Sequence, residues 1–93
     1  MTLNPEHTPV FPPRDIALQW EQVQNSHVIL YPEGMAKLND SAAAILQLVD
    51  GHTTLNGIIA QLNARFPGAE GLAEDVLEFF QRAYEQKWVT FRD

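Results

Sequence analysis

The sequence predicts an α+β fold that is winged-helix-like, with a three-stranded antiparallel sheet followed by three helices. Two observations support this prediction. Apolar residues alternate with period two over residues 16–21 and gather densely over residues 27–31, as they do in strands. After residue 39 they recur at i, i+3, i+4 and i+7, which is the pattern of a helix with one buried face. The length of 93 residues fits one domain with one hydrophobic core.

The N-terminal segment is rich in proline. Because proline fixes φ and lacks a backbone donor, this segment is expected to form neither a helix nor an inner strand. We predict a flexible proline-rich arm over residues 1–13 and a single winged-helix-like domain over residues 14–93. Val10 and Phe11 could dock the arm onto the body of the domain or onto a second copy, and we expect the first. The prolines of the arm are Pro5, Pro9, Pro12 and Pro13.

Three strands are predicted after the arm. The first covers residues 16–21, where apolar and polar side chains alternate. The second is "HVILY" (27–31), which we expect in the centre of the sheet because it is apolar on both faces. A Pro-Glu-Gly turn at residues 32–34 then returns the chain as a third strand, "MAKL" (35–38).

Three helices follow, and each has signals that mark its ends. Asn39 is at a suitable position for an N-cap, and Gly51 is expected to end the first helix as its C′ residue. Thr53 or Thr54 caps the second helix, which a Pro-Gly pair ends. The third helix covers about residues 70–86, and its apolar stripes span roughly half of its circumference. The chain is expected to close as a short strand or an extended tail.

The composition disfavours catalysis and nucleic-acid binding. Twelve acidic residues against six basic ones give a net charge of −6, which repels phosphate. The absence of cysteine removes disulfides, thiolate catalysis and cysteine-based metal sites. The three histidines lack ligand spacing, the acids of the third helix are typical of a solvated face, and no glycine-rich phosphate loop is present. We therefore expect no enzymatic activity, no cofactor and no metal.

No signal-peptide pattern and no apolar run of membrane-spanning length occur in the sequence, so we expect a cytoplasmic protein.

The third strand indicates a binding function. Natural proteins protect the edges of sheets with charge, proline or a covering element, yet "MAKL" carries one lysine and no other such device. If the third helix lies beside this edge, strand and helix together form a groove that accepts an extended peptide as a fourth strand. On the pattern alone, two alternatives stay open. The apolar stripes of the helix can belong wholly to the core, and the arm or a second chain can cover the edge.

The segment "HVILYPEGMAKLNDSAAAILQLVDG" (27–51) resembles the PqqD family of pyrroloquinoline quinone (PQQ) biosynthesis. The matching features are a strand ending in "LYPEG", the "KLN" that leads into "SA", the apolar "ILQL" and the terminal "DG". Upstream "LQWE" and downstream "TTLNGIIAQL" and "DVLEFF" match in the same order, so the resemblance covers about residues 12–91.

The resemblance implies a RiPP recognition element, a small domain without catalytic activity. It also implies two partners: a PqqA-type precursor peptide, and the radical S-adenosylmethionine enzyme PqqE, to which the peptide is presented. In such domains the peptide adds as a strand to the third strand of the sheet and packs against the third helix. Carried onto this sequence, the resemblance implies the peptide-binding residues Met35, Ala36, Lys37, Leu38, Asp75, Val76, Phe79, Phe80, Arg82 and Ala83.

This reading predicts that Ala36→Pro weakens peptide binding without unfolding the domain, because proline removes a donor from an edge strand. Two other functions compete with it. A winged-helix DNA-binding regulator shares the fold, although its recognition helix would carry only Arg65 as a base. A structural domain would instead form a homodimer through the N-terminal arm or the edge strand.

Overall fold

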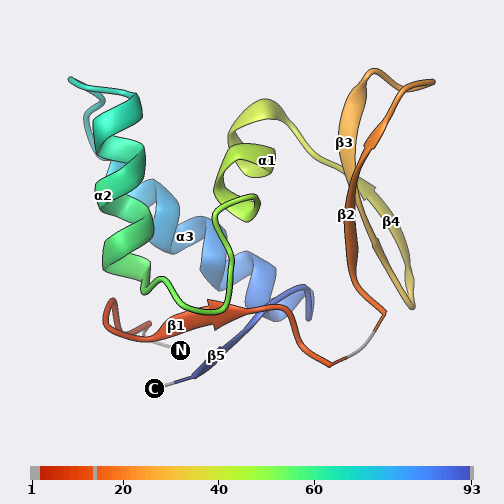
Figure 1. The fold of residues 1–93 in the computed structure, drawn as a ribbon, viewed down its shortest axis with the longest axis horizontal. Coiled ribbons are helices and arrows are strands. Elements are labelled where there is room, and N and C mark those ends of the chain that lie inside the picture. Colours follow the sequence, from red (N-terminus) through yellow and green to blue (C-terminus); the bar gives the residue numbers. More distant parts are fainter. Residues whose placement is uncertain (1–2, 14, 93) are drawn as a thin grey trace.

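The structure, a computed structural model, describes residues 3–13 and 15–92. It forms a three-stranded antiparallel sheet in the order β2-β3-β4, a two-stranded sheet of β1 and β5, and three helices (Figure 1). The elements are β1 (Thr8–Val10), β2 (Ala17–Glu21), β3 (Ser26–Tyr31), β4 (Gly34–Lys37), α1 (Asp40–Leu46), α2 (Leu55–Arg65), α3 (Leu72–Glu85) and β5 (Thr90–Arg92).

The three-stranded sheet confirms the predicted strand order. β3 is the central strand, and both Val28 and Ile29 are fully buried, which explains the dense apolar run at this position. Ile29 is paired with Leu18 on one side and with Ala36 on the other, so these three side chains lie on one face of the sheet. That face packs against the helices, because all three residues belong to the core or contact it.

The first helix begins as predicted but ends early. The side chain of Asn39 accepts a hydrogen bond from the backbone N–H of Ala42 at 2.7 Å, as an N-cap does. The helix then stops at Leu46, because the N–H groups of Leu48 and Val49 bond to carbonyls three residues back and tighten the backbone. The prediction that Gly51 ends this helix is therefore wrong, although Gly51 does have a positive φ of 81°.

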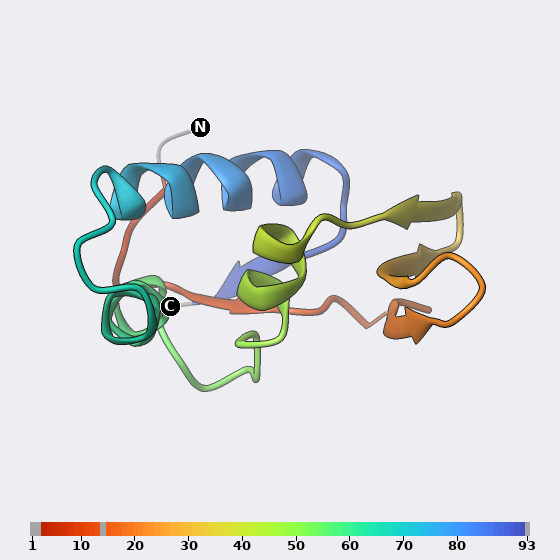
Figure 2. The same ribbon diagram turned by 90° about the horizontal axis from the view of Figure 1, so that it is seen from above.

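The other two helices agree with the predicted positions within two residues at each end. Thr54 caps α2 by accepting a hydrogen bond from the N–H of Gly57 at 3.1 Å. α3 buries Val76, Phe80 and Ala83 against the rest of the core. It passes beside α1, and its C-terminal end approaches the three-stranded sheet (Figures 1 and 2). In the described part of the chain, no helix is both long enough and apolar enough to span a membrane.

Part of the N-terminal segment, predicted as a flexible proline-rich arm, pairs with the C-terminal strand. Thr8–Val10 forms β1, which pairs antiparallel with β5, and proline is tolerated there because each strand of a two-stranded sheet has a free edge. The carbonyls of Pro5 and His7 accept hydrogen bonds from the N–H groups of Asn56 and Leu55 at 2.9 and 3.0 Å. These bonds satisfy two of the unpaired donors at the start of α2. Thr8–Val10 of the predicted arm is thus paired within the same chain, while residues 1, 2 and 14 of the predicted arm and its boundary lie outside the described residues.

Candidate functional site

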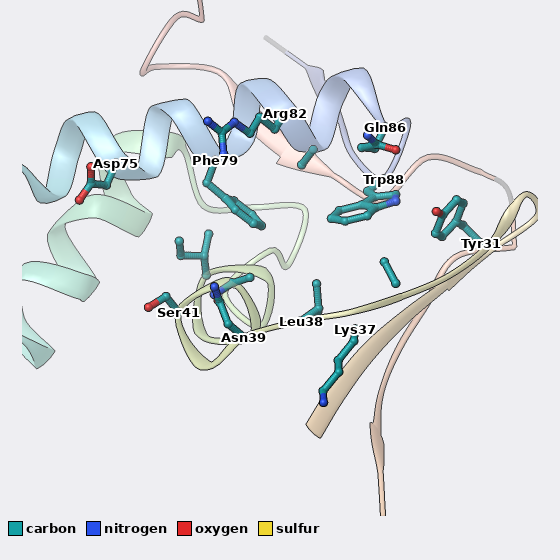
Figure 3. A pocket seen from close by; sticks show the side chains of 14 residues that line it. Tyr31, Lys37, Leu38, Asn39, Ser41, Asp75, Phe79, Arg82, Gln86 and Trp88 are labelled. Atoms are coloured by element: carbon teal, nitrogen blue, oxygen red, sulfur yellow. The ribbon is translucent and has the colours of Figure 1, made fainter. Parts of the chain in front are cut away.

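An open groove lies between β4 and α3, with α1 as its floor (Figure 3). Its volume is about 560 Å³. Side chains of β3 and β4 line one wall, and side chains from one face of α3 line the other. The residues that line it are Tyr31, Ala36, Lys37, Leu38, Asn39, Ser41, Ala42, Ile45, Asp75, Phe79, Arg82, Ala83, Gln86 and Trp88.

The groove brings together most of the residues that sequence analysis selected. Phe79 projects from α3 into the space above α1, and Lys37 extends away from α3 (Figure 3). Because β4 alternates its side chains, Ala36 and Leu38 face the helices. The predicted residues that line the groove are Ala36, Lys37, Leu38, Asp75, Phe79, Arg82 and Ala83.

Three predicted residues do not line the groove. Val76 and Phe80 are fully buried in the core, and neither lines the groove between β4 and α3. Residues 79 and 80 are adjacent, but a helix turns about 100° per residue, which directs one ring into the groove and the other into the core. The side chain of Met35, 49% exposed, lies on the opposite face of β4 from Ala36.

Sequence reasoning missed Trp88, which closes one end of the groove. The backbone N–H of Trp88 donates a hydrogen bond to the carbonyl of Ala83, and the backbone N–H of Lys87 donates one to the carbonyl of Tyr84. Together with the left-handed Lys87 (φ 65°), these bonds form a Schellman-type helix end, which turns the chain so that the indole lies 5.9 Å from the ring of Tyr31. Glycine is the usual residue at such a helix end, so the lysine found here gives no sequence signal for it. The other missed lining residues are Tyr31, Asn39, Ser41, Ala42, Ile45 and Gln86.

The outer edge of β4 faces no other strand among the described residues. The N–H of Leu38 donates to the carbonyl of His27 at 2.9 Å, and the register between β3 and β4 continues without a bulge. In an antiparallel ladder, backbone groups point alternately toward and away from the partner strand. Ala36 therefore directs its N–H and C=O toward β3, whereas Met35 and Lys37 direct theirs toward the open edge. The expectation that Ala36 donates to a peptide is wrong for this register.

Charged groups lie at the rim of the groove. Arg82 pairs with Glu78 at 2.6 Å across one helical turn, and both side chains are largely exposed. An exposed i, i+4 pair of this kind contributes only about 0.3–0.5 kcal/mol to stability. The middle of the groove is lined by apolar groups from Ala36, Phe79 and Ala83. The site thus combines an apolar wall with unpaired backbone groups, a combination suited to binding an extended chain.

Comparison with known proteins gives a family, close relatives and a solved structure. The family model described as "Coenzyme PQQ synthesis protein D (PqqD)" matches residues 26–89. The "PqqA binding protein" of Rahnella aquatilis is 56% identical over 93 residues, which cover 100% of this chain and 97% of the relative. The protein of the same name from Klebsiella pneumoniae is 62% identical over 80 residues, covering 86% of this chain and 87% of the relative.

The similar solved structure is a solution NMR structure of the PqqD truncation of Methylobacterium extorquens PqqCD. It is described as a functional, stand-alone RiPP recognition element. The two folds superpose with a TM-score of 0.78 at 28% sequence identity, covering 95% of this chain and 94% of the other.

Proposed function

Because the chain belongs to the PqqD family of coenzyme PQQ synthesis, we propose that it binds the PqqA precursor peptide as a non-catalytic chaperone. Its relatives in Rahnella aquatilis and Klebsiella pneumoniae carry the name PqqA binding protein. In this proposal the bound peptide is then presented to the radical S-adenosylmethionine enzyme PqqE, and the cytoplasm is the expected location. In this proposal the chain itself supplies no catalytic chemistry.

The observation that carries this proposal is the coincidence of an open strand edge with an apolar groove. Met35 and Lys37 present unpaired backbone groups at the same edge at which the half-buried Phe79 presents apolar surface. A peptide that pairs with β4 extends the sheet to four strands, and every second side chain of the peptide then faces α3. Backbone pairing supplies affinity for many sequences, whereas the side chains that face Phe79 and Trp88 select among them.

Two other functions receive less support from the structure. A DNA-binding regulator needs basic side chains on its recognition helix, but α2 carries only Arg65 and the whole chain has a net charge of −6. A dimerising domain would use the same free edge of β4, so a peptide and a second copy would compete for it. The N-terminal segment is less available for dimerisation, because β1 already pairs with β5.

Calorimetric titration with a synthetic PqqA peptide tests the proposal. We expect binding of one peptide per chain, with a negative heat-capacity change because apolar surface of the groove is buried. A peptide of the same composition in scrambled order is the control, and we expect it to bind more weakly because its apolar residues no longer match the alternation of the groove. Binding of duplex DNA without binding of PqqA would contradict the proposal. So would a stable dimer, seen by size-exclusion chromatography, that excess peptide does not alter.

A further inference from the structure

A second hollow adjoins the groove where the three helices meet. We call it the junction pocket. Its volume is about 390 Å³, and it lies between α1, the C-terminal end of α2 and the first half of α3. Most of its wall is apolar, and carboxylates stand at its mouth. Its main apolar residues are Ala44, Ile45, Leu62, Phe66, Leu72 and Val76.

Phe66 gives the junction pocket an exposed aromatic wall. This residue ends α2, and its side chain is 47% exposed. The guanidinium carbon of Arg65 lies over the ring, 5.4 Å from its centroid, in a cation–π contact. A ring with this much exposed apolar surface gains contact area when a ligand covers it.

The junction pocket is continuous with the groove. Ser41, Ile45 and Asp75 line both hollows. Figure 3 shows Ser41 on α1 and Asp75 on α3 on opposite sides of the groove, at the end away from Tyr31 and Trp88. A chain that leaves β4 in the direction of α1 therefore enters the junction pocket between these two residues.

The lengths of the elements agree with one peptide filling both hollows. The stretch of α3 from Leu72 to Gln86 is about 21 Å long at 1.5 Å per residue. An extended peptide covers that distance with about six residues at 3.3 Å each, whereas the four residues of β4 pair with only about four. Roughly two residues of the peptide thus lie beyond the strand edge.

The charges along this path differ between its two ends. Lys37 and Arg82, which is paired with Glu78, line the groove, Asp75 lines both hollows, and Asp40 lines the junction pocket. Among the described residues, neither aspartate forms an ion pair. No lysine or arginine is among the described residues that line the pocket, and the neighbouring Arg65 lies over the ring of Phe66. The mouth therefore favours a basic group on the ligand.

We infer that the junction pocket is a second subsite for the peptide that pairs with β4. It takes a large apolar side chain of that peptide, one or two residues beyond the paired segment, with a neighbouring basic residue placed beside Asp40 and Asp75. This inference rests on the proposed function, because it gives the peptide of the groove a longer binding footprint. The subsite selects peptides by their side chains, which backbone pairing with β4 alone does not do.

The test compares Phe66→Ala with the wild-type chain, using calorimetry and the synthetic PqqA peptide of Rahnella aquatilis. We expect Phe66→Ala to weaken binding about five- to tenfold, because a partly buried aromatic contact is lost. Tyr84→Ala is the matched control. Tyr84 is an aromatic residue of α3 with 39% exposure that lines neither hollow, and its removal should change affinity less than twofold.

The same titrations with peptides shortened stepwise from each end separate a direct contact from a general loosening of the fold. Once the peptide lacks the residues that reach the junction pocket, wild type and Phe66→Ala should bind it equally. Asp40→Asn should weaken the full-length peptide about two- to threefold at low salt, and the difference should disappear at about 0.5 M salt.

The titrations distinguish a failure of the second subsite from a failure of the proposed function. If the wild type binds PqqA while Phe66→Ala and Asp40→Asn bind it equally well at every peptide length, the second subsite is wrong and the proposed function stands. If the wild type does not bind PqqA at all, both are overturned.

Discussion

Replacing Phe80 with alanine is expected to lower the free energy of unfolding by about 3–5 kcal/mol, the usual effect of truncating a fully buried phenylalanine. Its ring has no exposed surface and makes edge-to-face contacts with Phe79 and Phe91 at centroid distances of 5.6 and 6.3 Å. A domain of this size has a total stability of about 5–15 kcal/mol, so the loss is a large fraction of the total and should clearly lower the midpoint of unfolding. Urea denaturation followed by circular dichroism measures the effect.

The adjacent residue provides the contrast. Phe79→Ala removes a ring that lines the groove, so it should leave a folded domain and weaken binding of PqqA about tenfold or more. The two changes remove the same atoms from neighbouring positions, and only their directions on α3 differ. If Phe79→Ala unfolded the domain as readily as Phe80→Ala, the groove wall would be part of the core. The binding site would then have to be elsewhere.

Lys37→Pro is expected to abolish measurable binding of PqqA at peptide concentrations that saturate the wild type. The register of β3 and β4 directs the N–H of Lys37 toward the open edge, so proline removes a donor that the peptide needs. Its ring also occupies space beside the edge where the peptide backbone would lie. The fold should survive, because this N–H takes no part in the ladder between β3 and β4.

Two other variants separate the loss of the outward backbone donor from the loss of the lysine charge and from damage to the inner ladder. Lys37→Ala removes the charge but keeps the backbone donor, so it should bind PqqA within about twofold of the wild type, as expected for a charge at the rim. Ala36→Pro removes a donor that faces β3, so it should lower stability by about 3 kcal/mol because it breaks the inner ladder. If Ala36→Pro stayed as stable as the wild type while losing the peptide, the assignment of the two backbone directions would be reversed.

The sequence predicts the elements well because local signals place them. Alternation over β2, the dense apolar run of β3 and the Asn39 cap of α1 each depend on a few neighbouring residues, and the structure confirms all three. The edge position of β4 was also predictable, because the segment is short and follows the dense apolar run of β3 after a tight turn. These features identify a sheet edge beside a helix, and hence the general place of the groove.

What the sequence could not supply depends on contacts between distant segments. β1 forms because β5, some eighty positions later, offers it a partner, and no local pattern reports that pairing. Trp88 reaches the groove because Lys87 adopts a left-handed backbone that glycine usually signals. The difference between Phe79 and Phe80 depends on the exact rotation of α3, which two overlapping apolar stripes leave open. The direction of each backbone group on β4 likewise required the observed register.

Amide hydrogen exchange, measured by NMR with and without saturating PqqA peptide, tests the central claim most directly. In the free domain, the amides of Met35 and Lys37 should exchange rapidly, whereas those of Ala36 and Leu38 should be protected by the ladder to β3. With the peptide bound, exchange at Lys37 should slow by about tenfold or more, because its N–H then donates to the peptide strand. Unchanged exchange at Lys37 and Met35 under saturating peptide would show that the peptide does not pair with β4.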